Sequence, residues 1–441
     1  MPIKEFLYEV CEQIRYKPIR SQIAEELESH LAESKEHYLE EGMEEKEAEE
    51  KAIAQMGEAE KIGKKLNKIH KPKFNWQLFI LTIILLEFGF ILSIPRAQDN
   101  KSTLILLILG MIPCVLIYFW DYKKLKKYSP YLYGIATIIL LHAEGRTFLL
   151  VGDYIISCAS ISMVLYVIAF VGFLQSLEKD RILRITVQER EIKVNKIGLI
   201  SGLSVFSILI FAVVANDIKS VIVLLLSYLI ISSVTLLHKK EKKLKAVAIL
   251  WGSVILSTIL LFTFLLVNDG AMREYRVNRF VASFIPEIAP NGEGWQGIEQ
   301  KKILDKANLF GEVEEVEQST RALFNVECDS FPLVAMLANY GIVVSILMVI
   351  MVLAFNINIL LSAKEIKDSY GKLLIIGISS LFLLRSIHCL LMNVNIGIKA
   401  SFSIPFISSG KIELIIDMIC LALIFSVYRR KNIEIVRENR L

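Results

Sequence analysis

Hydrophobic runs constrain this chain more than any other feature. After residue 75 they recur along the sequence, each close to the roughly 20 residues that an α-helix needs to cross a bilayer. The composition agrees, since 54% of the 441 residues are hydrophobic and the mean hydropathy is +0.51. Soluble domains contain nearer half apolar residues and average hydrophilic. The sequence therefore predicts an all-α, polytopic membrane protein.

We expect ten membrane-spanning helices with both chain ends on the cytoplasmic side. The spans are Trp76–Ile94, Thr103–Trp120, Tyr131–His142, Tyr154–Leu174, Ile197–Ala215, Ser220–Leu237, Ala246–Val267, Leu333–Leu361, Leu373–Leu391 and Ile412–Val427. Basic residues concentrate in every second connection, at Lys123–Lys127, Lys179–Lys196, Lys239–Lys245, Lys364–Lys372 and Arg429–Lys431. By the positive-inside rule these connections and both termini are cytoplasmic, and the large loop 268–332 lies outside.

The charged residues and cysteines exclude other classes of protein. The net charge of +4 is small, and the clustering of basic residues in short loops indicates membrane orientation rather than nucleic-acid binding. The six cysteines are scattered without C-x-x-C spacing, so we expect neither a zinc site nor a disulfide framework.

Residues 1–72 are charged and amphipathic, which predicts a small helical domain rather than a signal peptide. Apolar Phe6, Val10 and Ile14 recur at helical spacing. Pro18 and Gly42 separate three predicted helices. These breaks divide the segment before the first hydrophobic run into a helical domain of its own, followed by the membrane region 73–430 and a cytoplasmic tail 431–441.

The motif from Glu26 to Leu31, followed by Gly42–Ala48 and Gly57, resembles the HAAS or permease-prefix domain. That domain precedes membrane segments in many Firmicutes proteins, and the resemblance implies a cytoplasmic module that docks rather than catalyses. Glu26 and His30 lie one helical turn apart, which predicts a surface pair rather than a metal site.

The stretch from Met272 to Gly341 is the one long polar segment among the hydrophobic runs, so we expect chemistry outside the membrane to lie there. Arg273, Arg276 and Arg279 alternate with apolar residues at its start. Because Arg binds phosphate bidentately, these side chains contact either a substrate pyrophosphate or lipid headgroups.

Motifs along residues 76–430 resemble the SEDS family, whose members include RodA, FtsW and SpoVE. The large loop carries Tyr275, Arg279, Phe284–Glu287, Gly294–Gln296 and Leu309–Gly311; elsewhere the matching residues are Gly145-Arg146 with Phe148, Asn216–Ser220 and Ile404–Gly410. Ten spans, two inner termini and one large outer loop between spans seven and eight also match the plan of this family.

The resemblance implies a peptidoglycan glycosyltransferase of the bacterial cell membrane, acting in cell-wall synthesis, cell shape or division. Its substrate would be lipid II or another undecaprenyl-pyrophosphate-linked precursor, and its partner a class B penicillin-binding protein. A carboxylate would act as general base on the acceptor hydroxyl, an effect worth roughly 10²–10⁴-fold. Cations would stabilise the leaving pyrophosphate. No cofactor is implied, with a divalent cation as an open alternative.

The chain departs from the family at polar positions. Phe331 and Gly341 fit the frame of the family, but Ser330 occupies the position of its essential Asp, and the acid falls one place earlier at Asp329. Other polar motifs of the family are replaced at Ser157–Ser160, Ala338-Asn339 and Lys411.

Asp329 is the candidate catalytic base, and a solvated loop acid is the alternative. Glu327, two residues earlier, is a candidate substitute. The candidate substrate-binding residues are Arg146, Asp217, Arg273, Arg276, Arg279, Lys399 and Lys411. For Lys399 and Lys411, snorkelling to the interface explains the sequence equally well.

Four ionisable residues lie within predicted spans: Glu87, Arg385, His388 and Asp417. Charges there are costly and normally face a cavity or a partner. We expect Arg385 to pair with Asp417 and His388 to join the same polar cluster, acting as a structural clamp or as a proton or ion path.

Three functions remain open from the sequence. The first is the SEDS-type glycosyltransferase. The second is a catalytically weakened homologue that works as a regulatory or scaffolding membrane protein, which the amino-terminal domain favours. The third is a transporter of the lipid-linked precursor.

Overall fold

The structure is a computed structural model. It describes residues 2–94, 100–142, 148–151, 154–176, 182–187, 190–214, 217–237, 277–397, 402–407 and 411–432, with isolated positions between 248 and 263. The chain forms two compact units. The first combines Met1–Asn75 with Glu365–Asp368 and the chain from Val427 onward, and the second contains Trp76–Lys364 and Ser369–Ser426.

Short helices build the amino-terminal part of the first unit: α1 (Ile3–Glu12), η1 (Lys17–Ile19), α2 (Arg20–Glu40), α3 (Glu45–Met56) and α4 (Ala59–Ile69). Phe6, Val10, Leu31 and Ala52 form their common core. At Gly63 a Cβ atom would lie 2.6 Å from the Val10 carbonyl oxygen, so the glycine lets α4 pack directly on the backbone of α1. The three predicted helices are present, and α4 is a further helix that was not predicted from the sequence.

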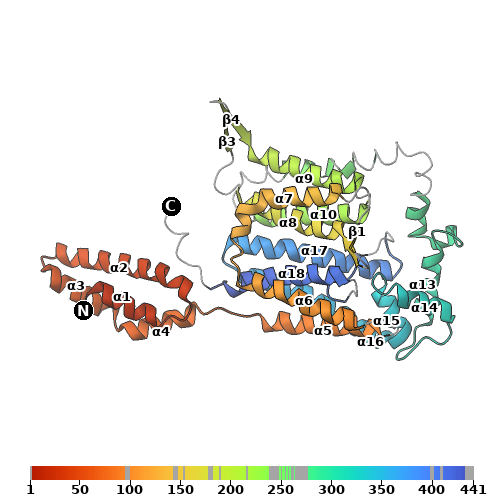
Figure 1. The fold of residues 1–441 in the computed structure, drawn as a ribbon, viewed down its shortest axis with the longest axis horizontal. Coiled ribbons are helices and arrows are strands. Elements are labelled where there is room, and N and C mark those ends of the chain that lie inside the picture. Colours follow the sequence, from red (N-terminus) through yellow and green to blue (C-terminus); the bar gives the residue numbers. More distant parts are fainter. Residues whose placement is uncertain are drawn as a thin grey trace. The chain divides into compact units, whose positions relative to one another are not determined.

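The second unit is a bundle of long helices that run alongside one another (Figure 1). They are α5 (Trp76–Ser93), α6 (Asn100–Phe119), α7 (Lys124–His142), α8 (Cys158–Ser176), α9 (Lys196–Val213), α10 (Ile218–Leu237), α16 (Ile342–Lys364), α17 (Ser369–Asn393) and α18 (Lys411–Arg429). Among the described residues, α5, α8, α9, α16 and α17 are long and apolar enough to cross a membrane. The sequence therefore folds into the predicted polytopic helical membrane protein.

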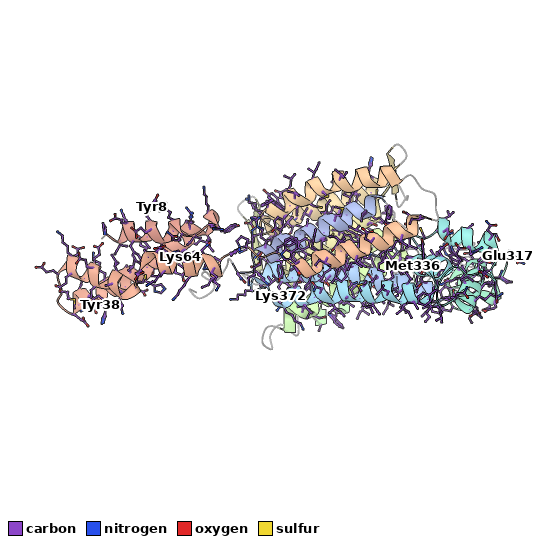
Figure 2. The ribbon with its side chains drawn as sticks, turned by 90° about the horizontal axis from the view of Figure 1, so that it is seen from below. Tyr8, Tyr38, Lys64, Glu317, Met336 and Lys372 are labelled. Atoms are coloured by element: carbon purple, nitrogen blue, oxygen red, sulfur yellow. The ribbon has the colours of Figure 1, made fainter. Side chains whose placement is uncertain are left out.

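A small folded region, which we call the loop region, covers one end of this bundle. We call that end of the bundle the loop end. The loop region contains η3 (Pro286–Ile288), α13 (Trp295–Lys306), α14 (Gln318–Val326) and α15 (Pro332–Tyr340). Figure 2 shows Glu317 at the loop end and Lys372 at the opposite end of the helices. Two short antiparallel hairpins, β1 (Phe148–Val151) with β2 (Tyr154–Ser157) and β3 (Ile182–Val187) with β4 (Arg190–Asn195), occur where no strand was expected.

The predicted spans coincide with helices except at three places. The span predicted at Tyr154–Leu174 begins with the strand β2, and its helix α8 starts only at Cys158. The span at Ala246–Val267 falls mostly outside the described residues. The span predicted as one helix over Leu333–Leu361 is divided at Gly341 into α15 and α16, because this glycine has a φ of 87° and ends α15. The Ile342 amide donates to the Asn308 carbonyl over 2.9 Å, so the loop segment at 308 lies directly against the break.

Gly341 provides a test of this arrangement. A Cβ atom at Gly341 would lie 2.8 Å from the Leu309 carbonyl oxygen, whereas Gly311, with a similar φ of 83°, has open space around it. Left-handed backbone costs an L-residue about 1–2 kcal/mol. We expect Gly341→Ala to lower the thermal unfolding temperature of the purified protein clearly more than Gly311→Ala does. Equal losses for the two variants would contradict close packing of the loop on the helix break.

Candidate functional site

The predicted catalytic acid lies in a tight turn between α14 and α15. The Glu327 carbonyl closes this turn by accepting the Ser330 amide over 2.9 Å and the Phe331 amide over 3.0 Å. Phe331 is buried and packs edge-on against Phe324 of α14, with ring centroids 5.3 Å apart. Asp329 and Ser330, which lie between these anchors, are half-buried. The turn thus presents two adjacent polar side chains from a fixed backbone.

Asn393, at the end of α17, holds this turn. Its side-chain oxygen accepts the amides of Leu333 and Val334 over 3.0 and 3.2 Å, which caps the amino terminus of α15. Its amide nitrogen donates to the Ser330 carbonyl over 3.1 Å and to the Cys389 carbonyl over 2.8 Å. The side chain is fully buried and all its hydrogen-bonding groups are used.

A second carboxylate, Glu327, lies at the start of the same turn. Gln296 of α13 donates its side-chain N–H to Glu327 Oε2 over 2.5 Å. Burial raises the pKa of the Glu327 carboxyl above its usual 4.5, and the hydrogen bond from Gln296 only partly opposes this shift. A carboxylate with a raised pKa, held by one neutral donor, is a chemically plausible proton acceptor beside Asp329.

Other amides tie the loop region to the end of α17. Gln300 donates to the Met392 carbonyl over 2.8 Å, and Asn395 donates to the Gly297 carbonyl over 2.9 Å. Asn395 adopts a left-handed conformation with a φ of 60°. Because these contacts and those of Asn393 are buried or half-buried, the loop region and α17 form one folded piece.

The predicted substrate-binding residues are only partly described. Asp217 is buried at the amino terminus of α10, where its carboxylate accepts the Ser220 hydroxyl over 2.9 Å. The half-exposed Arg279 lies 4.0 Å from Glu293. Arg146, Arg273, Arg276 and Lys399 lie outside the described residues, as does the side chain of Lys411.

Arg385 and Asp417 meet inside the bundle. Arg385 Nη1 lies 2.6 Å from Asp417 Oδ1, and both side chains are almost completely buried. Arg385 Nη2 also donates to the Ser403 hydroxyl over 2.9 Å. Ser403 in turn donates to Glu413 Oε2 over 2.7 Å, and Ser160 of α8 donates to Glu413 Oε1 over 3.3 Å. A polar network therefore joins α8, α17, α18 and the segment 402–407.

This network fixes the segment 402–407 within the bundle. The Phe406 amide donates to the Asp417 carboxylate, and Phe406 has a φ of 66°, which is uncommon for a residue with a side chain. Its ring packs against Phe355 and Phe382. A Cβ atom at Gly89 of α5 would lie 2.8 Å from the Ile407 carbonyl oxygen, so a larger residue there would displace the segment.

His388 and Glu87 are the other two intramembrane residues. His388 packs edge-on against the Phe402 ring, with centroids 5.3 Å apart. Glu87 is exposed on α5. The predicted four-residue cluster is therefore centred on Arg385 and Asp417, with Ser403 and Glu413 as the members that sequence reasoning missed. Glu413 lies four residues before Asp417 on an apolar helix, a spacing that could have revealed it.

Metal binding has no support from the described side chains. No group of three or more His, Cys, Asp and Glu residues among them is arranged to hold a metal ion.

The fold and this site define a polytopic helical membrane protein with a folded loop region fastened to one end of its bundle. The family profile described as cell cycle protein, for FtsW, RodA and SpoVE, matches residues 76–433. The chain therefore belongs to the FtsW/RodA/SpoVE family. A probable peptidoglycan glycosyltransferase FtsW from Trichlorobacter lovleyi is 26% identical over 156 residues, which cover 35% of this chain and 40% of that relative.

Solved structures share the fold. A chain from a peptidoglycan synthase complex that coordinates polymerization and crosslinking aligns with a TM-score of 0.60 and 16% identity, covering 81% of this chain and 98% of that one. The rod shape determining protein RodA of Thermus thermophilus, as an aspartate-to-alanine mutant, aligns with a TM-score of 0.56 and 14% identity over 81% and 98% of the two chains. The sequence match to the Trichlorobacter lovleyi FtsW spans about two fifths of the length of that protein.

The buried ion pair yields a double-mutant test. Removing one partner of a buried pair leaves an uncompensated charge and costs about 3–5 kcal/mol, whereas replacing both by apolar residues is often neutral. We expect Arg385→Met to lower the unfolding temperature strongly, and Arg385→Met with Asp417→Leu to recover much of the loss. The measurement is thermal unfolding of the purified protein in detergent. A double variant less stable than Arg385→Met would contradict a pair that acts mainly as a structural clamp.

Proposed function

We propose that this protein is a peptidoglycan glycosyltransferase that polymerises lipid II in cell-wall synthesis, cell shape or division. The observation that carries the proposal is the turn 327–331, which holds two carboxylates at the loop end of a bundle with the fold of this family. A long lipid tail requires a membrane-embedded protein, and the sugar chemistry requires a water-facing carboxylate at its edge.

In the proposed reaction Asp329 is the general base. Its carboxylate accepts the proton of the acceptor sugar hydroxyl while that oxygen forms a bond to the anomeric carbon of the donor. The bond from the anomeric carbon to the pyrophosphate breaks, and undecaprenyl pyrophosphate leaves with the electron pair. Such proton transfer contributes roughly 10²–10⁴-fold to the rate. Glu327 is the alternative base, supported by its burial and its hydrogen bond from Gln296.

In this proposal, cationic residues would bind the pyrophosphate. Arg279, together with Arg146, Arg273, Arg276, Lys399 and Lys411, supplies the charge in this proposal, with a divalent cation as an additional option. Arg is suited to this role because its planar fork binds two phosphate oxygens at once. The side chain of Arg279 is about half exposed, which leaves it accessible to a ligand.

The proposed partner is a class B penicillin-binding protein, and one matching structure is that of a peptidoglycan synthase complex. We also propose that both termini lie in the cytoplasm and that residues 1–72 form a docking module of the HAAS type. The position of Lys372 at the end of the bundle opposite Glu317 is consistent with this orientation (Figure 2).

A regulatory or scaffolding role is the second candidate function. Ser330 occupies the position of the essential Asp of the family, and its hydroxyl cannot act as a base at neutral pH. A homologue that retains the folded loop region but has lost this acid would still bind partners through it.

Variants of the turn separate the candidates. We expect Asp329→Ala to lower polymerisation of lipid II by roughly 10²–10⁴-fold, because the base is lost. Glu327→Gln, which keeps the side-chain shape, should lower it less than tenfold. Asp305→Ala is the control, since this exposed acid lies in α13 of the same loop region. The measurement is glycan product from purified protein with lipid II and a partner. Full activity in Asp329→Ala contradicts Asp329 as the base, and no product from the wild type favours the scaffold.

The pH dependence of kcat/KM tests whether Glu327 is the general base. A general base must be deprotonated, so the rate rises with pH as its carboxyl titrates. Because burial raises the pKa of Glu327, a rising limb due to this group lies above pH 4.5. With Asp329 as the base, we expect Glu327→Gln to leave the rising limb of kcat/KM in place. Loss of that limb in Glu327→Gln, but not in Asp305→Ala, would transfer the role to Glu327.

The proposed orientation is tested with reporters. An enzyme that is active only in the cytoplasm, fused after Arg430, should be active, and the same reporter inserted at Gly311 should be silent. An exported reporter at the same two positions should give the reverse pattern. Activity of the cytoplasmic reporter at Gly311 would invert the assignment.

A further inference from the structure

Glu87 lies on the exposed face of a membrane-spanning helix. The helix α5 packs into the bundle through Leu78, Thr82, Leu85 and Leu92, which are buried. Glu87 follows Leu85 by two residues, so its side chain is turned by about 200° from that face. It is exposed, and among the described residues none forms a hydrogen bond or an ion pair with it. Its carboxyl group therefore faces outward from the bundle.

The depth of Glu87 makes this exposure costly. The Tyr340 hydroxyl donates to the Ile91 carbonyl over 3.1 Å, which places the carboxyl-terminal end of α5 at the loop end of the bundle. Glu87 precedes Ser93, the last residue of α5, by six residues, or about 9 Å along the helix. Glu is shorter than Lys and Arg, the residues that snorkel to the interface from within a span. An acid at this depth normally has a partner.

The surroundings of Glu87 indicate what that partner is. Trp76, Ile80, Ile83, Phe90 and Ile94 are exposed on the same face, with Ile80 and Phe90 both 53% accessible. With Glu87 they follow a spacing of four, three, four, three and four residues. That is the seam along which two helices pack in a left-handed pair. A single polar residue in such a seam fixes the register of the second helix.

Another face of α5 packs against α16. The side chain of Asn358 in α16 donates to Gln77 Oε1 over 3.2 Å, and α16 packs along α5 within the bundle. The exposed residues Trp76, Ile80, Ile83, Glu87, Phe90 and Ile94, which we call the Glu87 seam, lie on a different face of α5 from the contact with α16. A helix from another chain can pack on this face. Its negative charge selects a positively charged side chain.

We propose that Glu87 and the apolar seam around it dock a membrane-spanning helix of a partner protein that carries a basic side chain at the matching depth. This interaction is independent of glycosyl transfer, because Glu87 lies outside the turn 327–331 and its contacts. The partner helix would place Lys or Arg opposite Glu87 and pack apolar residues on Ile83 and Phe90.

The test uses the full chain, labelled with a fluorescence donor and reconstituted in lipid vesicles. The probes are acceptor-labelled, single-span Leu/Ala peptides that carry either Lys or Leu six residues from one end of the span. We expect the Lys peptide to associate with the wild type roughly five- to thirtyfold more tightly than the Leu peptide does. Glu87→Leu should remove this preference, and its unchanged unfolding temperature should show that the bundle is intact.

A relocated acid makes the test specific to register. The chain with Ile83→Glu and Glu87→Leu should prefer a peptide whose Lys is moved by four residues away from that end, and should not prefer the original one. Equal association of the Lys and Leu peptides with the wild type would overturn the proposal, whatever the variants do. Energy transfer between donor- and acceptor-labelled copies of the chain itself, lost in Glu87→Leu, would overturn it in favour of a second copy as the occupant.

Discussion

The cost of a charge inside the bilayer governs the architecture of the bundle. Arg385 cannot be left unpaired among apolar helices, and its guanidinium donates to both Asp417 and Ser403. Because Ser403 belongs to the segment 402–407 and Asp417 receives the Phe406 amide, pairing this one cation also determines where that non-helical segment lies. Non-helical backbone at membrane depth requires such internal hydrogen-bond partners.

The helix α17 links the buried ion pair to the candidate site, because it carries both Arg385 and Asn393. Arg385 and Asn393 are eight residues apart on α17, or about 12 Å. The first binds the segment before α18, and the second binds the turn between α14 and α15. Both side chains are buried and hydrogen-bonded on a helix packed against α8, α10 and α16. The loop region is therefore attached to a helix that is largely enclosed by the bundle, and this helix supports the turn that carries its carboxylates.

Much of the fold followed from the sequence because membrane helices leave a strong hydrophobic signal. The span predicted at Leu373–Leu391 lies within α17, and the span predicted at Ile412–Val427 lies within α18. Arg385 stood out in the first span and Asp417 in the second, because charges are rare there. The break at Gly341 was missed, since an apolar run continues across it and only the approach of Leu309 requires the glycine. Asn393 was missed as well. An amide near a helix end has no periodic signature, and its role depends on a turn 60 residues away in the chain.

The Asn393 side chain also contacts residue 330, the position at which we expect the chain to differ from its family. Asn393 contacts the Ser330 carbonyl, and the Glu327 carbonyl contacts the Ser330 amide, so the turn is held by main-chain groups at this position. Its backbone geometry does not depend on the side chain of residue 330, and replacing an acid there leaves the clamp intact. Conversely, a carboxylate at 329 or 327 emerges from the same fixed turn, in a different direction from one at 330. The sequence change therefore moves the acid along the turn without altering the hydrogen bonds that support it.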